Sequence, residues 1–180
     1  MNTQTDSQPH PRLTARFIEP VSNYADIIQQ QVDQARAGVA SAFKVRAQLL
    51  EQGRSETVLA ASNQLTLRLK VYASGGENTL HAHVNEDHLF VLLQGSADFF
   101  DEEGLMASLS AHQGVALPKG TRYRFIATSS QPLVMLRVGS PNEAALGLEG
   151  RVDSVGKPAD PQTPENKNVA PIFKPNAYFG

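Results

Sequence analysis

Between residues 43 and 138, short apolar runs are separated by turn-forming residues, and in the runs 43–49 and 65–71 the hydrophobic residues recur at every second position. Alternation with a period of two places successive side chains on opposite faces of a β-strand. Many short strands at even spacing favour a β-sandwich or a barrel. The expected strands cover residues 43–49, 56–61, 65–71, 80–84, 88–93, 97–101, 105–109, 115–117, 123–127 and 133–138.

The segments on either side of these strands have a different pattern. Residues 1–40 are expected to hold an extended arm and then an amphipathic helix, which begins at Ser22 or Asn23 and ends near Ala37, with Gly38 as its stop. Residues 41–140 form the expected barrel, and residues 141–180 form a proline-rich tail. The tail ends in apolar residues, so it is either anchored on the barrel or a neighbouring subunit, or it is a loose polar end.

Composition excludes several classes of function. The chain has 180 residues, a formal net charge of -2 and no cysteine. The absence of cysteine excludes disulfides, thiolate zinc sites and cysteine nucleophiles. A net charge near zero predicts no binding to nucleic acid or to an anionic membrane. The polar N-terminus lacks a signal core and no apolar run is long enough to span a bilayer, so a cytoplasmic protein is expected.

Three of the five histidines fall within eight residues, at His81, His83 and His88. His81 and His83 share one face of an expected strand, and His88 begins the next expected strand. Neutral imidazole is a common ligand of divalent metals, so the cluster predicts a site for Fe, Mn, Ni or Zn. Glu86 is a rival third ligand because it has the strand parity of His88, although Glu86 and Asp87 are expected on the connecting turn.

This spacing resembles the first motif of the cupin superfamily, in which glycine, His-x-His, glutamate and glycine follow one another at fixed intervals. The corresponding residues are Gly75, His81, His83, His88 and Gly95, with histidine where cupins usually have glutamate. The second cupin motif ends in Pro-x-Gly-x-x-His. Here it runs from Pro118 through Gly120 to Tyr123, so that tyrosine stands at the usual histidine position.

The resemblance implies an all-β double-stranded β-helix, or jelly-roll barrel, that holds a metal site. It implies a metal-dependent enzyme such as an Fe(II)-dependent dioxygenase, acting on a small diketone, enol or acidic substrate. His81, His83 and His88 would hold the metal, and Tyr123 would donate a proton or a hydrogen bond. Alternatives are a small-ligand binding or sensing protein without activity, a cupin isomerase or decarboxylase, and a partner-binding barrel. Because cupins are commonly dimeric, a homodimer is expected.

Alternation also predicts which residues line the barrel. If Tyr123 points inward, then Phe125 does too, while Arg122 and Arg124 face solvent. Phe90, Leu92 and Phe99 are expected to form an apolar lining. Arg137 lies in the apolar run 133–138. One interpretation is that its guanidinium binds a substrate carboxylate. The favoured interpretation is that Arg137 lies at a sheet edge or faces the surface.

Overall fold

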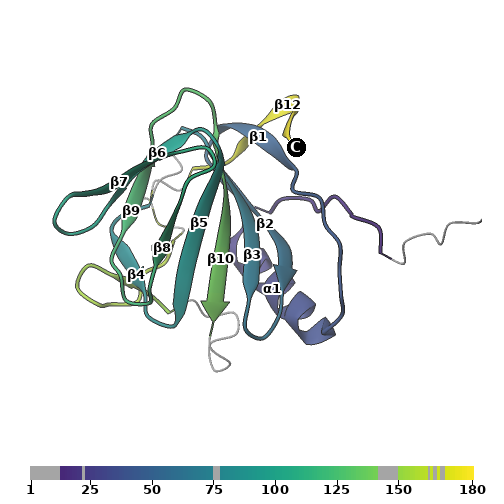
Figure 1. Ribbon diagram of the computed structural model, residues 1–180, viewed down its shortest axis with the longest axis horizontal. Helices are drawn as coiled ribbons and strands as arrows, with labels where there is room; N and C mark the ends of the chain where they lie inside the picture. The colour runs from purple at the N-terminus through teal and green to yellow at the C-terminus, as the bar shows by residue number, and fades with distance from the viewer. Residues whose placement is uncertain are drawn as a thin grey trace, which may run out of the picture.

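The computed structural model describes residues 13–21, 23–74, 78–141, 150–161, 163, 166 and 169–180, and within them one helix and twelve strands (Figure 1). The elements are α1 (Tyr24–Ala37), β1 (Ala47–Gln52), β2 (Arg54–Ala61), β3 (Thr66–Tyr72), β4 (His81–His83), β5 (Glu86–Gln94), β6 (Ser96–Phe100), β7 (Leu105–Ser110), β8 (Gly114–Leu117), β9 (Arg124–Ala127), β10 (Leu133–Pro141), β11 (Arg151–Asp153) and β12 (Ile172–Phe179).

Two antiparallel layers face each other across the barrel. One is a five-stranded sheet in the order β2-β3-β10-β5-β8. The other contains β7-β6-β9 and the pair β11-β4, which are joined by a backbone bridge between His81 and Tyr123. Figure 1 shows the two layers next to each other, with β7, β9 and β4 on the left and β5, β10, β3 and β2 on the right. The arrangement is the all-β double-stranded β-helix, or jelly-roll barrel, predicted from the sequence.

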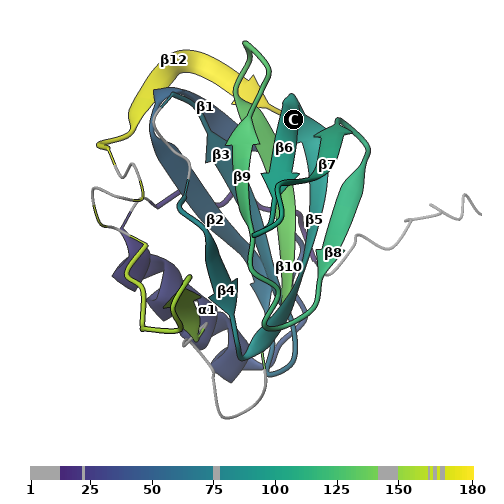
Figure 2. The same ribbon diagram turned by 90° about the vertical axis from the view of Figure 1, so that its left-hand side faces the viewer.

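Helix α1 begins and ends where its flanking residues predict. The Asn23 side chain accepts a hydrogen bond from the Ala25 amide at 2.8 Å, and Gly38 adopts the left-handed conformation with φ of 59°. Ile27 and Gln31 are buried, and the helix packs against β2. The helix therefore covers the edge of the larger sheet near the end of the barrel that holds the histidines (Figure 2).

Each face of the larger sheet packs on a different core. The inner core lies between the layers, and its buried members include Phe90, Leu92, Phe99 and Phe125, which confirms their expected place in the lining. The outer core covers the opposite face and contains residues from β1, β2, β3 and β10. Phe173 and Phe179 of β12 pack on this outer core. Both faces of the larger sheet are therefore buried over much of their area.

The C-terminal segment contributes one strand to a separate two-stranded sheet and one strand to the smaller layer. β12 pairs with β1, and β11 pairs with β4, with Arg151 opposite His83 and Asp153 opposite His81. The segment is thus anchored on the barrel of its own chain, one of the two alternatives drawn from its apolar residues. The first expected strand is shifted, because Phe43 makes only an isolated bridge and pairing begins at Ala47.

Some predictions fall on parts of the chain that are not described. Gly75, Gly76 and most of the expected N-terminal arm lie outside the described residues. Within the described part of the chain, no helix is long and apolar enough to cross a membrane.

Candidate metal centre and cavity

The short strand β4 places two of the predicted ligands at one end of the barrel. His81 and His83 are 3% and 6% exposed, and both belong to the smaller layer. The backbone of Tyr123 exchanges two hydrogen bonds with His81, and the His83 carbonyl accepts a hydrogen bond from the Gly120 amide. The Pro118 to Gly120 turn and Tyr123 thereby fix the position of the histidine strand.

The larger layer contributes Glu86 and His88 from β5. The prediction that Glu86 lies on a connecting turn is wrong: β5 begins at Glu86, whose side chain is buried, while Asp87 is exposed. Alternation along the strand points Glu86, His88 and Phe90 toward the interior. The His88 Nε2 atom lies 2.6 Å from Glu86 Oε1, and His88 Nδ1 lies 3.1 Å from the Tyr123 hydroxyl.

His83, Glu86 and His88 are close enough to share a metal ion. One possible ligand atom from each of them lies within 4.8 Å of the other two, and all three residues are buried. His81 lies outside this group of three, although its ring centroid is 5.1 Å from that of His83 and 4.7 Å from that of Tyr123. Two imidazoles and a carboxylate are ligands that suit Fe, Mn, Ni or Zn. These residues therefore fit the divalent metal that the cupin resemblance implies.

The imidazole of His81 is held neutral by its surroundings. Burial lowers the pKa of His81 to about 3, and the nearby Arg151 guanidinium contributes to the same shift. His81 Nδ1 lies 2.8 Å from the Thr79 carbonyl oxygen, so the neutral ring donates there and leaves Nε2 as an acceptor. The ring is therefore in the form in which histidine binds metal.

Arg137 lies in the interior, so the favoured expectation of an edge or surface position is wrong. Its side chain is 2% exposed and contacts both Glu86 Oε1 and His88 Nε2. It lies on β10 opposite Phe90 of β5, on the inward face of the sheet. A guanidinium therefore contacts the carboxylate and one imidazole of the candidate metal group.

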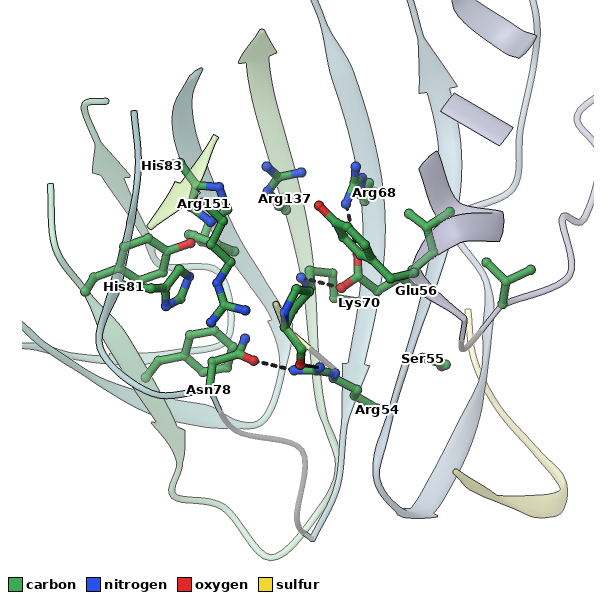
Figure 3. Close-up of a pocket in the computed structure, with 17 residues that line it drawn as sticks. Arg54, Ser55, Glu56, Arg68, Lys70, Asn78, His81, His83, Arg137 and Arg151 are labelled. Carbon is green, nitrogen blue, oxygen red and sulfur yellow. Dashed lines mark hydrogen bonds and ion pairs between the residues drawn. The ribbon is translucent and has the colours of Figure 1, made fainter. Parts of the chain in front are cut away.

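A cavity of about 40 Å³ lies between the layers beside this group. Its lining includes His81, His83, Tyr123, Phe90 and Phe125. Five cationic side chains complete much of the wall: Arg54, Arg68, Lys70, Arg137 and Arg151. Figure 3 shows His81, His83 and Arg151 on one side of the cavity and Arg68, Lys70 and Glu56 on the other, with Arg137 between them.

Carboxylates and amides hold these cations in place, and Arg137 lies beside Glu86. Glu56 accepts from Lys70 at 2.6 Å and from Arg68 at 3.3 Å. Arg54 donates to the neutral amide oxygen of Asn78 and to a backbone carbonyl. Arg151 donates to the amide oxygen of Asn166 at 2.8 Å.

Sequence reasoning did not find the cationic side chains of β2, β3 and β11. Arg68 and Lys70 alternate with leucine and valine, a pattern typical of a strand with one apolar, buried face. Here the apolar set packs on the outer core and the basic set lines the barrel. The sequence contains one indirect sign that the basic side chains face the barrel interior. The segments 43–50 and 172–179 contain apolar residues, and these cover the outer face of the larger sheet.

Comparison with known proteins gives the fold alone. No family model matches the sequence, and no curated protein matches it. Similar solved structures include KdgF from Halomonas sp., with 22% identity, coverage of 50% of this chain and 82% of the other, and a TM-score of 0.45.

Two further neighbours are described as cupins. A sugar phosphate isomerase from a cupin superfamily, from Silicibacter pomeroyi, has 24% identity, coverage of 50% of this chain and 60% of the other, and a TM-score of 0.45. An RmlC-like cupin from Shewanella frigidimarina has 15% identity, coverage of 52% of this chain and 84% of the other, and a TM-score of 0.44. The similarity covers about half of the chain.

Proposed function

We propose that the chain is a divalent-metal-binding barrel enzyme that acts on a small acidic, enol or diketone substrate. The observation that supports the proposal is the group formed by His83, Glu86 and His88, whose ligand atoms lie together beside a cationic cavity. Neutral His81 stands next to them as a further ligand. A bound divalent metal would supply Lewis-acid polarisation of a substrate oxygen.

The chain's own residues would bind the substrate and manage its proton. The cationic wall favours the acidic member of the proposed substrate classes, because charge-assisted hydrogen bonds to a carboxylate are stronger than neutral ones. Phe90 and Phe125 contribute apolar surface to the same cavity. The Tyr123 hydroxyl, 3.1 Å from His88 Nδ1, is placed to hold or pass a proton between that imidazole and a substrate atom.

Metal loading of untagged protein tests the proposal. We expect about one Fe(II), Mn(II), Ni(II) or Zn(II) ion per chain by elemental analysis, in line with one cluster of N and O ligands. His83→Ala should remove bound metal and Glu86→Gln should weaken it. His112→Ala is the matched control, because His112 is an exposed loop residue.

Two results would contradict the metal site. One is untagged protein that takes up none of the four metals, and the other is His112→Ala losing as much metal as His83→Ala. His88→Ala addresses the ligand set: full occupancy in that variant would leave His83, Glu86 and His81 as the ligands. Dioxygen consumption by Fe(II)-loaded protein with a panel of diketones and small acids then tests whether the protein is a dioxygenase, as the cupin resemblance implies.

The contact of Arg137 with Glu86 and His88 favours a second candidate, a ligand-binding or sensing barrel without catalysis. In that case the guanidinium is the permanent counter-ion of Glu86, and a buried ion pair of this kind is costly to break. Substrate turnover by metal-loaded protein distinguishes the two candidates. Ligand binding without turnover across the whole panel would favour the sensing function.

A further inference from the structure

The C-terminal segment brings the buried side chain of Asn166 to Thr79, just before the histidine strand β4. Asn166 is 5% exposed, and its side-chain oxygen accepts hydrogen bonds from the Thr79 amide at 3.2 Å, the Thr79 hydroxyl at 3.0 Å and Arg151 at 2.8 Å. Its side-chain nitrogen donates to the Asp160 carbonyl and to the Thr163 hydroxyl, both at 3.0 Å. A guanidinium can only donate and a carbonyl can only accept, so these partners fix which end of the carboxamide faces Thr79.

Thr79 passes this constraint to His81. Because β4 begins at His81, Thr79 lies before the ladder that β4 forms with β11. The Thr79 carbonyl oxygen lies 2.8 Å from His81 Nδ1. A carbonyl oxygen has no proton to give, so Nδ1 holds the proton of the neutral ring and Nε2 holds the lone pair. The position of one threonine therefore selects one of the two neutral forms of His81.

We propose that Asn166 is a positioning residue of the candidate metal centre: it holds Thr79 so that the His81 ring keeps its proton on Nδ1 and presents Nε2 to the metal. Metal-binding histidines commonly donate their second ring nitrogen to a fixed acceptor, which sets the neutral form of the ring and its orientation. Here the acceptor is a backbone carbonyl, and a side chain 87 residues later in the sequence holds it in place. The neutral form of the ring is a property of the metal-free chain, and its use in metal binding rests on the proposed function.

A purely structural role for Asn166 makes a different prediction. The side-chain nitrogen connects Asn166 to Asp160 and Thr163 of its own segment, whereas the side-chain oxygen connects it to Thr79. Asn166→Asp keeps an oxygen toward Thr79 and removes both nitrogen donors, and Asn166→Leu removes all of these contacts at similar volume. If Asn166 only anchored its own segment, the two variants would have the same effect on His81. A positioning residue should be replaceable by aspartate and not by leucine.

Nitrogen-15 NMR of metal-free, full-length protein tests the inference, because long-range proton–nitrogen correlations show which ring nitrogen carries the proton. The chain has five histidines, and the His81 signals are those lost in His81→Gln. We expect wild type and Asn166→Asp to hold His81 in the Nδ1–H form, and Asn166→Leu to shift a measurable share of it to the Nε2–H form. Wild-type His81 in the Nε2–H form, or the same His81 signals in Asn166→Leu as in wild type, would overturn the inference.

The affinity for Zn(II), measured by competition with a chelator, gives a second readout. Asn166→Leu should bind Zn(II) about tenfold to a hundredfold more weakly than wild type, the usual effect of removing an outer partner of a metal ligand. Asn166→Asp should stay close to wild type. Asn63→Leu is the matched control, because Asn63 lies exposed in the turn between β2 and β3. Equal losses in Asn166→Leu and Asn63→Leu, or in Asn166→Leu and Asn166→Asp, would contradict the positioning role.

Thr79→Val serves where Asn166→Leu does not fold. This variant removes the hydroxyl donor to Asn166 and leaves the C-terminal segment unchanged. We expect a smaller rise in the Nε2–H share of His81 and a smaller loss of Zn(II) affinity than in Asn166→Leu. Unchanged His81 signals in Thr79→Val would overturn the inference.

The two readouts separate this inference from the metal site. If His81 changes its neutral form in Asn166→Leu but wild-type protein takes up no metal, the metal site is wrong and the role of Asn166 in fixing His81 stands. If wild-type protein takes up metal but His81 keeps the same neutral form in Asn166→Leu, the metal site stands and this inference is wrong.

Discussion

Single residues in this barrel take their chemistry from burial more than from their neighbours in sequence. The pKa of His81 falls to about 3 because the folded chain removes its imidazole from water. Arg137 is surrounded in sequence by apolar residues and lies beside a carboxylate from another strand. Residue type indicated what these side chains can do, and the fold decides which of them meet.

The shifted pKa of His81 predicts a pH dependence of stability in metal-free protein. Between about pH 6.5 and pH 3 the unfolded chain binds a proton at this residue that the folded chain excludes, so stability falls as pH decreases. From pH 7 to pH 5 the loss should be about 2 kcal/mol. Urea unfolding of wild type and His81→Gln at both pH values measures it, and the same loss in both proteins would contradict the assignment to His81.

Site residues were predictable to the extent that they belong to one short segment. His81, His83, His88 and the alternative Glu86 lie within eight residues, and alternation brings the last three toward the same interior. Arg54, Lys70 and Arg151 could not be assigned in this way. They come from three strands, and only the pairing of β2 with β3 and of β11 with β4 brings them to one cavity.

At the scale of elements, strand β5 separates interior from surface with a period of two. Leu92 is 0% exposed and packs in the inner core, whereas Leu89 of the same strand is 40% exposed. The apolar run from Leu89 to Leu93 was sufficient to predict this strand, and Phe90 and Leu92 were expected in the lining or core. It did not show that the strand begins at Glu86, because the polar pair of Glu86 and Asp87 is also typical of a turn.

The two leucines of β5 provide a matched test of this orientation. Leu92→Ala should cost about 2–5 kcal/mol in the free energy of unfolding, since it leaves a cavity in the inner core. Leu89→Ala should cost less than about 1 kcal/mol, as is usual at the surface. Chemical denaturation of both variants gives the comparison, and similar losses would mean that the strand does not have this register.

At the scale of the whole molecule, each face of the larger sheet packs on a hydrophobic core, so neither face is left mainly to solvent. β12 and β1 cover the outer core, and Phe173 packs on it from the C-terminal segment. The barrel between residues 43 and 138 was predictable because each of its strands carries its own alternation or its own apolar run. The cover was harder to predict, because prolines interrupt residues 158–175 and a sequence gives no direct sign of which distant strand pairs with β1.

Loss of contacts from β12 should destabilise the entire barrel. Phe173→Ala should lower the free energy of unfolding by about 2 kcal/mol, since it removes a half-buried aromatic ring from the outer core. Ile172→Ala, at a neighbouring position that is 48% exposed, is the control and should cost under about 1 kcal/mol. Because β12 pairs within its own chain, the effect should be constant over roughly a hundredfold range of protein concentration. A concentration-dependent loss would point to exchange of this strand between subunits.

The pairing of β11 with β4 has a consequence for the order of events during synthesis. The histidine strand leaves the ribosome about 70 residues before Arg151, its partner in the β-ladder. Contacts between such distant residues form late, because a long loop must close before they stabilise anything. The histidines are thus translated well before the wall that encloses them, and a nascent chain can meet metal ions in the cell before its cavity exists.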